Sequence, residues 1–173
     1  MIDTLISSQT RLKLLLKFFL NPDSRAYLRG LETEFGESTN GIRVELNRFE
    51  KAGLIESETT GNKKFFKANI HHPIFGDIRN IVLKYLGFDK IIDNILNRLG
   101  ELKAAYVVGD YAKGLDTGII DLVLVGNIDK AYLIKKIDKA ELLIKRKIRF
   151  VIYLEEEFNI EGLGENFIAI WKE

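Results

Sequence analysis

Apolar side chains recur at helical spacing near the start of the chain. Leucine and phenylalanine stand at i, i+3, i+4 and i+7 from Leu12 to Phe19, which predicts the buried stripe of a helix. Ser7 or Ser8 is a suitable N-cap for this helix. Asn21-Pro22-Asp23 is expected to end it after about residue 20.

A second helix is predicted directly after this turn. Ser24 is its expected N-cap, and Gly36, which tolerates a left-handed backbone, is its expected end. The residues that share its apolar face are Tyr27, Leu28, Leu31 and Phe35.

A third helix and a hairpin follow in the pattern. The helix is predicted to start at Ser38 or Thr39 and to stop at Gly53, and its buried face holds Ile42, Leu46 and Phe49. Two strand-like runs, 54–59 and 64–68, then flank a Gly61-Asn62 turn. This order of elements is typical of a winged helix-turn-helix, which lays its third helix in the DNA major groove and its hairpin tip on the backbone.

Several polar side chains in this region suit contacts with DNA. Arginine reads guanine with two hydrogen bonds, asparagine reads adenine, and lysine or hydroxyl groups suit phosphates. Glu45 and Glu50 are expected to point away from the DNA face or to weaken binding. A scaffold that only contacts proteins is the alternative. The candidate DNA-binding residues are Arg29, Thr39, Asn40, Arg43, Asn47, Arg48, Asn62, Lys63 and Lys64.

Two phrases of this half resemble the ArsR-like winged-helix regulators. They are Tyr27-Leu28-Arg29-Gly30-Leu31 and the Leu-Asn-Arg-Phe-Glu-Lys-Ala-Gly-Leu-Ile run that starts at Leu46. The resemblance implies the fold and the DNA-binding mode of that family. The chain lacks the Cys ligands of the metal-sensing members, so metal sensing is not implied.

The next segment predicts a helical connector. Pro73 of His71-His72-Pro73 is expected to start a helix that Gly87 ends, and a further helical stretch is expected from about Asp89 to Leu102. Such paired helices serve as a dimer interface or as a spacer. The adjacent histidines are not expected to bind metal, because neighbouring side chains diverge and no acidic or Cys partner lies at ligand spacing.

Strands and helices alternate in the second half, which predicts an α/β sandwich around a small mixed sheet. The expected strands are 104–108, 119–125, 148–154 and a short one at 167–171, where Trp171 packs in the core. Asp129 is the expected N-cap of a helix that runs to about Lys145. The basic run Lys145-Arg146-Lys147 with Arg149 is expected to complement the helix dipole, with anion binding as the alternative. The residues expected to face inward from this helix are Leu133, Ile134, Ile137, Ala140 and Ile144.

The segment from Gly109 to Leu122 resembles the minimal nucleotidyltransferase domains of the polymerase-β type. Those domains carry Gly-Ser at a strand-to-helix turn, then Ala-Arg/Lys-Gly, then Asp-x-Asp on the next strand and a third acidic residue on a later strand. In them, backbone N–H groups and the serine hold phosphate oxygens, and the carboxylates hold Mg²⁺. The positions that form the corresponding candidate nucleotide site are Gly109, Asp110, Lys113, Gly114 and Asp121.

The match departs from the family at the residues that carry the chemistry. Asp110 stands at the serine position, where a carboxylate repels phosphate, and Ile119 stands at the first metal position. The run 147–153 holds no acidic residue. We therefore expect a degenerate domain with no catalytic residue, no metal and no cofactor. An active Mg²⁺-dependent nucleotidyltransferase remains the alternative, because Asp110 and Asp121 together provide two carboxylates.

Charge and cysteine content narrow the function classes only slightly. With 26 Lys and Arg against 25 Asp and Glu, the net charge is +1, and the front half leans basic while the back half leans acidic. The lack of cysteine excludes a disulfide framework, thiolate catalysis and a Cys-based zinc site, and it suits a reducing cytoplasm. No apolar run approaches the roughly 20 residues of a membrane span.

The whole chain resembles one fusion family, an ArsR-like winged helix followed by a nucleotidyltransferase-fold domain. The expected fold class is α+β, with a DNA-binding domain at 1–70, a helical connector at 71–102 and a nucleotidyltransferase-like domain at 103–173. The resemblance implies a bacterial or archaeal transcriptional regulator that binds double-stranded DNA as a homodimer. Its second domain would then serve for assembly or for sensing an unknown small-molecule or protein effector. An antitoxin-like protein-interaction module is a further alternative.

Overall fold

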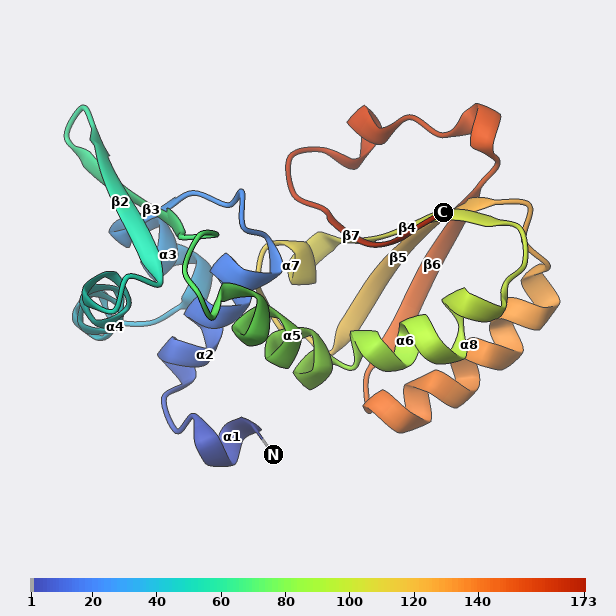
Figure 1. Ribbon diagram of the computed structural model, residues 1–173, viewed down its shortest axis with the longest axis horizontal. Coiled ribbons are helices and arrows are strands. Elements are labelled where there is room, and N and C mark those ends of the chain that lie inside the picture. Colours follow the sequence, from blue (N-terminus) through green and yellow to red (C-terminus); the bar gives the residue numbers. More distant parts are fainter. Residues whose placement is uncertain (1) are drawn as a thin grey trace. The chain divides into compact units, whose positions relative to one another are not determined.

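The computed structural model describes residues 2–173, apart from the side chains of residues 2 and 3. The chain divides into two compact units, residues 1–82 and 83–173. Helix α5 (Phe75–Leu86) carries the chain from the first unit into the second, and each unit has its own small sheet (Figure 1). The protein is therefore of the mixed α/β kind. No helix in the described part of the chain has the length and apolar character that a membrane span requires.

The first unit combines short helices with an antiparallel three-stranded sheet in the order β1-β3-β2. Leucine and phenylalanine side chains from its longer helices fill its interior. Examples are Leu14, Phe18, Leu31 and Leu46. Its elements are α1 (Ile2–Leu5), α2 (Gln9–Leu15), η1 (Leu16–Leu20), β1 (Ala26–Tyr27), α3 (Leu28–Phe35), α4 (Thr39–Lys51), β2 (Ile55–Thr60) and β3 (Lys63–Ala68).

The first predicted helix begins where expected and ends differently. Ser8 is the N-cap of α2, and its hydroxyl accepts the N–H of Arg11 at 3.2 Å. The chain then widens into a π-helical turn, η1, instead of continuing as one α-helix to residue 20. Lys17 lies in this turn, buried, with its Nζ 2.9 Å from the Glu34 Oε1 atom.

The predicted N-cap of the second helix, Ser24, is wrong. The backbone stays extended through Ala26 and Tyr27, because these residues pair with Phe66 and Phe65 of β3. Helix α3 therefore begins at Leu28 and has Tyr27 as its N-cap. A strand pairing with a residue far along the chain overrides the local capping preference.

The remaining helix ends and the hairpin of the first unit are confirmed. Gly36 adopts φ 63° and ends α3, and the Ser38 hydroxyl caps α4 by accepting the N–H of Gly41. Helix α4 stops at Ala52, and Gly53 follows in the left-handed region. Strands β2 and β3 pair antiparallel from Ile55 opposite Ala68 to Thr60 opposite Lys63, around the predicted turn.

The connector begins later and is shorter than predicted. Pro73 lies in a turn, and α5 starts two residues after it at Phe75. The helical part after Gly87 consists of α6 (Phe88–Asn94) and η2 (Leu96–Arg98) only. Leu102 is not helical, because it begins strand β4 (Leu102–Val108).

Gly87 separates α5 from α6 at a point where the chain allows no side chain. Its φ is +81°, and an added Cβ would lie 2.5 Å from the Ile144 Cγ2 atom. The glycine therefore provides both the left-handed backbone and the room for Ile144.

The second unit is built on a four-stranded sheet in the order β6-β5-β4-β7. Strands β5 and β6 run parallel, and the other neighbours are antiparallel. Helices α6 and α8 lie on one face of the sheet, and the connection between β6 and β7 lies on the other (Figure 1). The further elements are α7 (Gly109–Ala112), β5 (Ile119–Gly126), α8 (Lys130–Ile144), β6 (Lys147–Tyr153), η3 (Glu155–Glu157), η4 (Ile160–Leu163) and β7 (Ile168–Lys172).

The strand predictions of this half are confirmed to within two residues, as is Asp129, whose carboxylate caps α8 by accepting the N–H of Tyr132 at 3.0 Å. One inward residue of α8 was wrong, because Ile134 is 42% exposed. Its neighbours Leu133 and Ile137 are buried, so the helix buries a narrower stripe than its apolar pattern indicates. Trp171 is only partly buried, and its indole N–H donates to Asn97.

The first unit also buries a carboxylate between two arginines. Glu45 of α4 is 6% exposed, and its oxygens accept from Arg11 at 2.9 and 3.2 Å and from Arg48 at 2.9 Å. The hydrogen bonds from Arg11 hold the pKa of Glu45 below its usual value, although burial opposes this shift. Glu45 thus points into the unit and joins α4 to α2.

We expect Glu45→Gln to lower the free energy of unfolding at neutral pH by about 1–3 kcal/mol, because it removes charge-assisted hydrogen bonds. Because folding lowers the pKa of Glu45, its contribution is present above the pKa of the unfolded state and is lost as the pH falls through the lower folded value. The gap between wild type and variant in urea unfolding should therefore narrow in acid. Glu56→Gln, at an exposed position of β2, is the matched control. A gap independent of pH would contradict this assignment.

Candidate functional site

A cleft of about 550 Å³ opens between α3, α4 and the β2–β3 hairpin. Its floor is apolar and its rim is basic and amide-bearing. The floor consists of Tyr27, Leu28, Leu46 and Phe66, and the rim consists of Arg29, Arg43, Asn47, Asn62, Lys63 and Lys64. All six rim residues are candidates from the sequence, so the fold brings most of the predicted DNA-binding set into one place.

The hairpin lysines lie over the aromatic side chains of this cleft. Lys63 Nζ is 4.4 Å from the centre of the Tyr27 ring, and Lys64 Nζ is 5.0 Å from that of Phe66. Such contacts hold a cation over an aromatic face while leaving its outer side in solvent. Lys64 also pairs with Glu50 at 2.8 Å, and this hydrogen bond, with one from Ser57, holds the pKa of Glu50 below its usual value.

Two arginines of the rim keep their charges available. The side chains of Arg29 and Arg43 are exposed, and neither makes a hydrogen bond or ion pair within residues 4–173. Asn47 is exposed one turn after Arg43 on α4, which places both on the same helix face. These groups can therefore bind an anion or a base edge without first breaking an internal contact.

The other three candidates lie outside the cleft lining. The Thr39 hydroxyl donates to Glu32 at 2.6 Å, and Arg48 pairs with the buried Glu45. Asn40 is exposed on the first turn of α4. Thr39 and Glu32 lie on different helices, so helical spacing does not predict their contact, whereas Arg48 and Glu45 are three residues apart on α4, a spacing at which side chains meet.

The second candidate site is the turn that joins β4 to β5 in the other unit. Gly109 has φ +69°, and a Cβ on it would lie 2.7 Å from the Asp121 Oδ2 atom. The backbone at Gly109 thus passes directly beside the Asp121 carboxylate. Asp110 is partly buried, Lys113 is exposed, and Gly114 is buried with φ +84°. The fold therefore brings Gly109 and Asp121 together, as the resemblance implies.

Arg149 occupies both oxygens of Asp121. The two residues are paired in the parallel register of β5 and β6, and Arg149 Nε and Nη2 lie 2.6 and 2.9 Å from Asp121 Oδ1 and Oδ2. The hydrogen bond to Asp121 raises the pKa of Arg149, and the charge of Asp110 adds to the effect. Sequence reasoning missed this pair, because strand register decides it.

The residues of this site do not fit a magnesium ion. Mg²⁺ requires several hard oxygen ligands in near-octahedral geometry. Here the Asp121 carboxylate is bound bidentately by a guanidinium, and Ile119 presents a hydrocarbon side chain two residues earlier. Within the described part of the chain, no three His, Cys, Asp or Glu side chains gather as a metal site would need.

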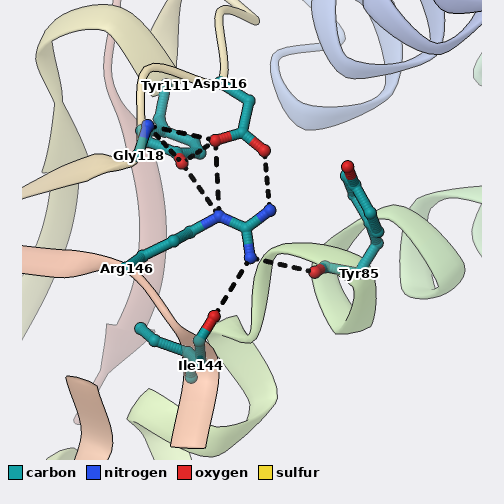
Figure 2. A network of polar contacts seen from close by, with 6 residues as sticks. All are labelled: Tyr85, Tyr111, Asp116, Gly118, Ile144 and Arg146. Atoms are coloured by element: carbon teal, nitrogen blue, oxygen red, sulfur yellow. Dashed lines mark hydrogen bonds and ion pairs between the residues drawn. The ribbon is translucent and has the colours of Figure 1, made fainter. Parts of the chain in front are cut away.

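A polar network around the buried Tyr111 fixes the loop beside this site. The Tyr111 hydroxyl donates to Asp116 and accepts from Gly118 N at 3.2 Å and from Arg146 Nε at 2.9 Å. Figure 2 shows the Arg146 guanidinium reaching between Asp116, at 2.6 Å, and the main-chain oxygens of Tyr85 and Ile144. The network joins α7, the start of β5 and the end of α8 to the end of α5.

The network also sets the charge states of its members. Burial and the hydrogen bond to Asp116 raise the pKa of Tyr111, so its hydroxyl remains a donor. Burial opposes the ionised form of Asp116, but hydrogen bonds from Arg146 and Tyr111 outweigh it and lower the pKa of Asp116. Arg146 does bind a carbonyl at the end of α8, as the helix-dipole prediction implies, while its ion pair with Asp116 was not predicted.

We expect Asp116→Asn to lower the free energy of unfolding by about 2–3 kcal/mol, because it leaves the Arg146 guanidinium without its counter-charge in a mostly buried place. Urea unfolding followed by circular dichroism measures the change. Asp138→Asn, at an exposed position of α8, makes the same chemical change as a control. An equal effect of the two substitutions would show that the ion pair contributes nothing to stability.

Comparisons with known proteins place few constraints on the chain. No protein-family model matches it, and no curated protein matches it either. Among solved structures, a chain of the tri-AMPylated HEPN toxin in complex with MNT antitoxin from Shewanella oneidensis is similar at 14% identity and a TM-score of 0.38, over 51% of this chain and 71% of that one. A proposed nucleotidyltransferase from Sulfolobus solfataricus is similar at 20% identity and a TM-score of 0.35, over 53% of this chain and 83% of that one.

Proposed function

We propose that the first unit binds double-stranded DNA and that the protein is a transcriptional regulator. The observation that supports this is the cleft between α3, α4 and the hairpin, whose rim holds four cationic and two amide side chains. Helix α4, about 20 Å long by its 13 residues, is of a size that enters a major groove. The order of elements and the β1-β3-β2 sheet support a winged helix-turn-helix as the fold of this unit.

The side chains divide into base-reading and phosphate-binding roles in this proposal. Arg43 and Asn47, with Asn40 on the first turn, read base edges from α4. Arg29, Lys63 and Lys64 bind phosphates on the two sides of the cleft, with Asn62 at the hairpin tip. Thr39 and Arg48 contribute only after exchanging their internal partners Glu32 and Glu45 for DNA.

The second unit is proposed to be a nucleotidyltransferase-like domain without transfer activity. The support is the Arg149 guanidinium, which holds the remaining family carboxylate, Asp121, on both oxygens. Phosphoryl transfer depends on metal ions and on electrostatic positioning, and an arginine on the carboxylate removes the ligand that a metal would need. The unit is left with assembly or sensing as its role. We propose that the regulator acts as a homodimer, because two recognition helices on a palindromic site require two chains.

The test of DNA binding is fluorescence anisotropy on the DNA upstream of the protein's own gene, with a scrambled competitor and a salt series. We expect selective binding whose affinity falls steeply with salt, because phosphate contacts release counterions. Arg43→Ala should weaken specific binding by about tenfold or more and relax selectivity, since a bidentate base contact is worth about 1–3 kcal/mol.

Lys67→Ala is the matched control for charge. Lys67 is exposed on β3 and is not among the residues that line the cleft. Equal losses for both variants would remove α4 as the base-reading element. The absence of salt-dependent binding in the wild type would remove DNA as the ligand and favour the protein-interaction alternative.

Nucleotidyl transfer is tested with labelled nucleoside triphosphates and Mg²⁺ under conditions that label known transferases. We expect the wild type to incorporate no more label into itself or into added protein than Asp121→Ala does. Mg²⁺-dependent incorporation that Asp121→Ala abolishes would show that the second unit is an enzyme.

A further inference from the structure

The outer edge of β6 carries main-chain groups without a strand partner. The Lys147 N–H donates inward to Gly118 O at 2.9 Å, on the β5 side. Because successive residues of a strand alternate in direction, the N–H and C=O groups of Ile148, Phe150 and Ile152 point to the outer side. Within the described residues no other strand pairs there. An edge strand of this length is a template for another chain.

The outer side of the first part of β6 is closed by α8. The Ile148 N–H donates to Glu141 Oε1 at 2.7 Å, and Lys147 pairs with the same carboxylate at 2.7 Å. No main-chain bond of this kind engages the outward groups of Phe150 and Ile152 in the described part of the chain. The open part of the edge is therefore the second half of the strand.

The flank of α8 beside this edge exposes a large apolar side chain. Glu141 identifies that flank, because it reaches the outward N–H of Ile148. Ile134 and Asp138 lie on the same flank by helical spacing. Ile134 is 42% exposed. Apolar side chains at such positions favour burial against a partner.

Exposed apolar side chains also lie at the β6 edge on the opposite face of the sheet. Val151 and Tyr153, on the face that carries Arg149, are 41% and 38% exposed. Apolar surface thus lies on both sides of the free main-chain groups, which is the arrangement of a strand that continues into another sheet.

We propose that a second copy of this chain occupies this edge, with β6 of each subunit pairing antiparallel about a two-fold axis at Val151. The two sheets then form one continuous sheet, and the α8 helices come together on one face. In this register Phe150 and Ile152 of each subunit exchange both main-chain hydrogen bonds with Ile152 and Phe150 of the partner subunit.

The side chains of β6 are complementary to themselves in this register. Arg149 faces Tyr153 of the partner subunit, so a cation–aromatic pair flanks the Val151 contact on each side. The paired segment is 149–153, because α8 closes the edge at Ile148 and the η3 turn begins at Glu155.

The proposal names the dimer surface of the proposed regulator. It rests on the homodimer in the proposed function and not on DNA binding. The test therefore uses the full chain without DNA, so that its failure is distinct from a failure to bind DNA.

The first measurement is the molar mass by light scattering across a concentration series. We expect the wild type to reach twice its 19.8 kDa chain mass. Val151→Glu should weaken dimerisation by more than about tenfold, because it places like charges opposite each other at the axis. Ala169→Glu, at an exposed position of the other edge strand β7, is the matched control and should leave the dimer intact.

The second measurement uses the lack of cysteine in the chain. Val151→Cys introduces a single thiol at the axis, where the two copies meet in a non-hydrogen-bonded pair with closely spaced Cα atoms. Mild oxidation should yield a covalent dimer, whereas Ala169→Cys should yield only the amount formed by collision. This result supports the proposal even if Val151→Glu fails to fold.

Three outcomes would overturn the proposal. They are a monomeric wild type at all concentrations, a dimer that Val151→Glu leaves unchanged while folded, and cross-linking of Val151→Cys no faster than that of Ala169→Cys. A monomer that binds a strand-forming peptide at β6 would point to a different protein as the occupant.

Discussion

The Arg146 guanidinium holds together the part of the second unit on which its site and its free edge depend. It binds Asp116 and the Tyr111 hydroxyl before β5, and the carbonyls of Tyr85 and Ile144 at the ends of two helices. The group is mostly buried, so all of its donors must be satisfied at once. This requirement fixes where β6 begins relative to β5, and that position puts Arg149 opposite Asp121.

Because Arg146 must satisfy all of its donors inside the unit, the basic segment that holds Arg146 and Arg149 serves two purposes. Arg146 points into the unit and stabilises it, while Arg149, on the open face of β6, neutralises the Asp121 carboxylate. The first unit divides its cations in the same way. Arg11 and Arg48 compensate the buried Glu45, and Arg43 remains exposed in the cleft. In both units, internal pairing decides which charges a ligand can meet.

The sequence predicted the features that neighbouring residues control. Ser8, Ser38 and Asp129 cap helices because a side-chain oxygen reaches an N–H three residues later, and Gly36 and Gly53 end helices because they accept a left-handed backbone. Ser24 failed because Tyr27 pairs with distant Phe65. The Asp121–Arg149 pair and the exposure of Ile134 were not predicted from the sequence for a related reason. The packing of the whole unit determines the strand register and which helix positions are covered.

The packing at Gly87 restricts which substitutions the sequence can accept at positions 87 and 144. An alanine there needs both a left-handed backbone and the space now filled by the Ile144 side chain. A smaller residue at 144 relieves the second cost but not the first. Among homologues, residue 87 should therefore remain glycine wherever residue 144 is β-branched, and a larger residue at 87 should arise only after 144 has become small. The order of the two substitutions is set by packing, whatever the function of the protein that carries them.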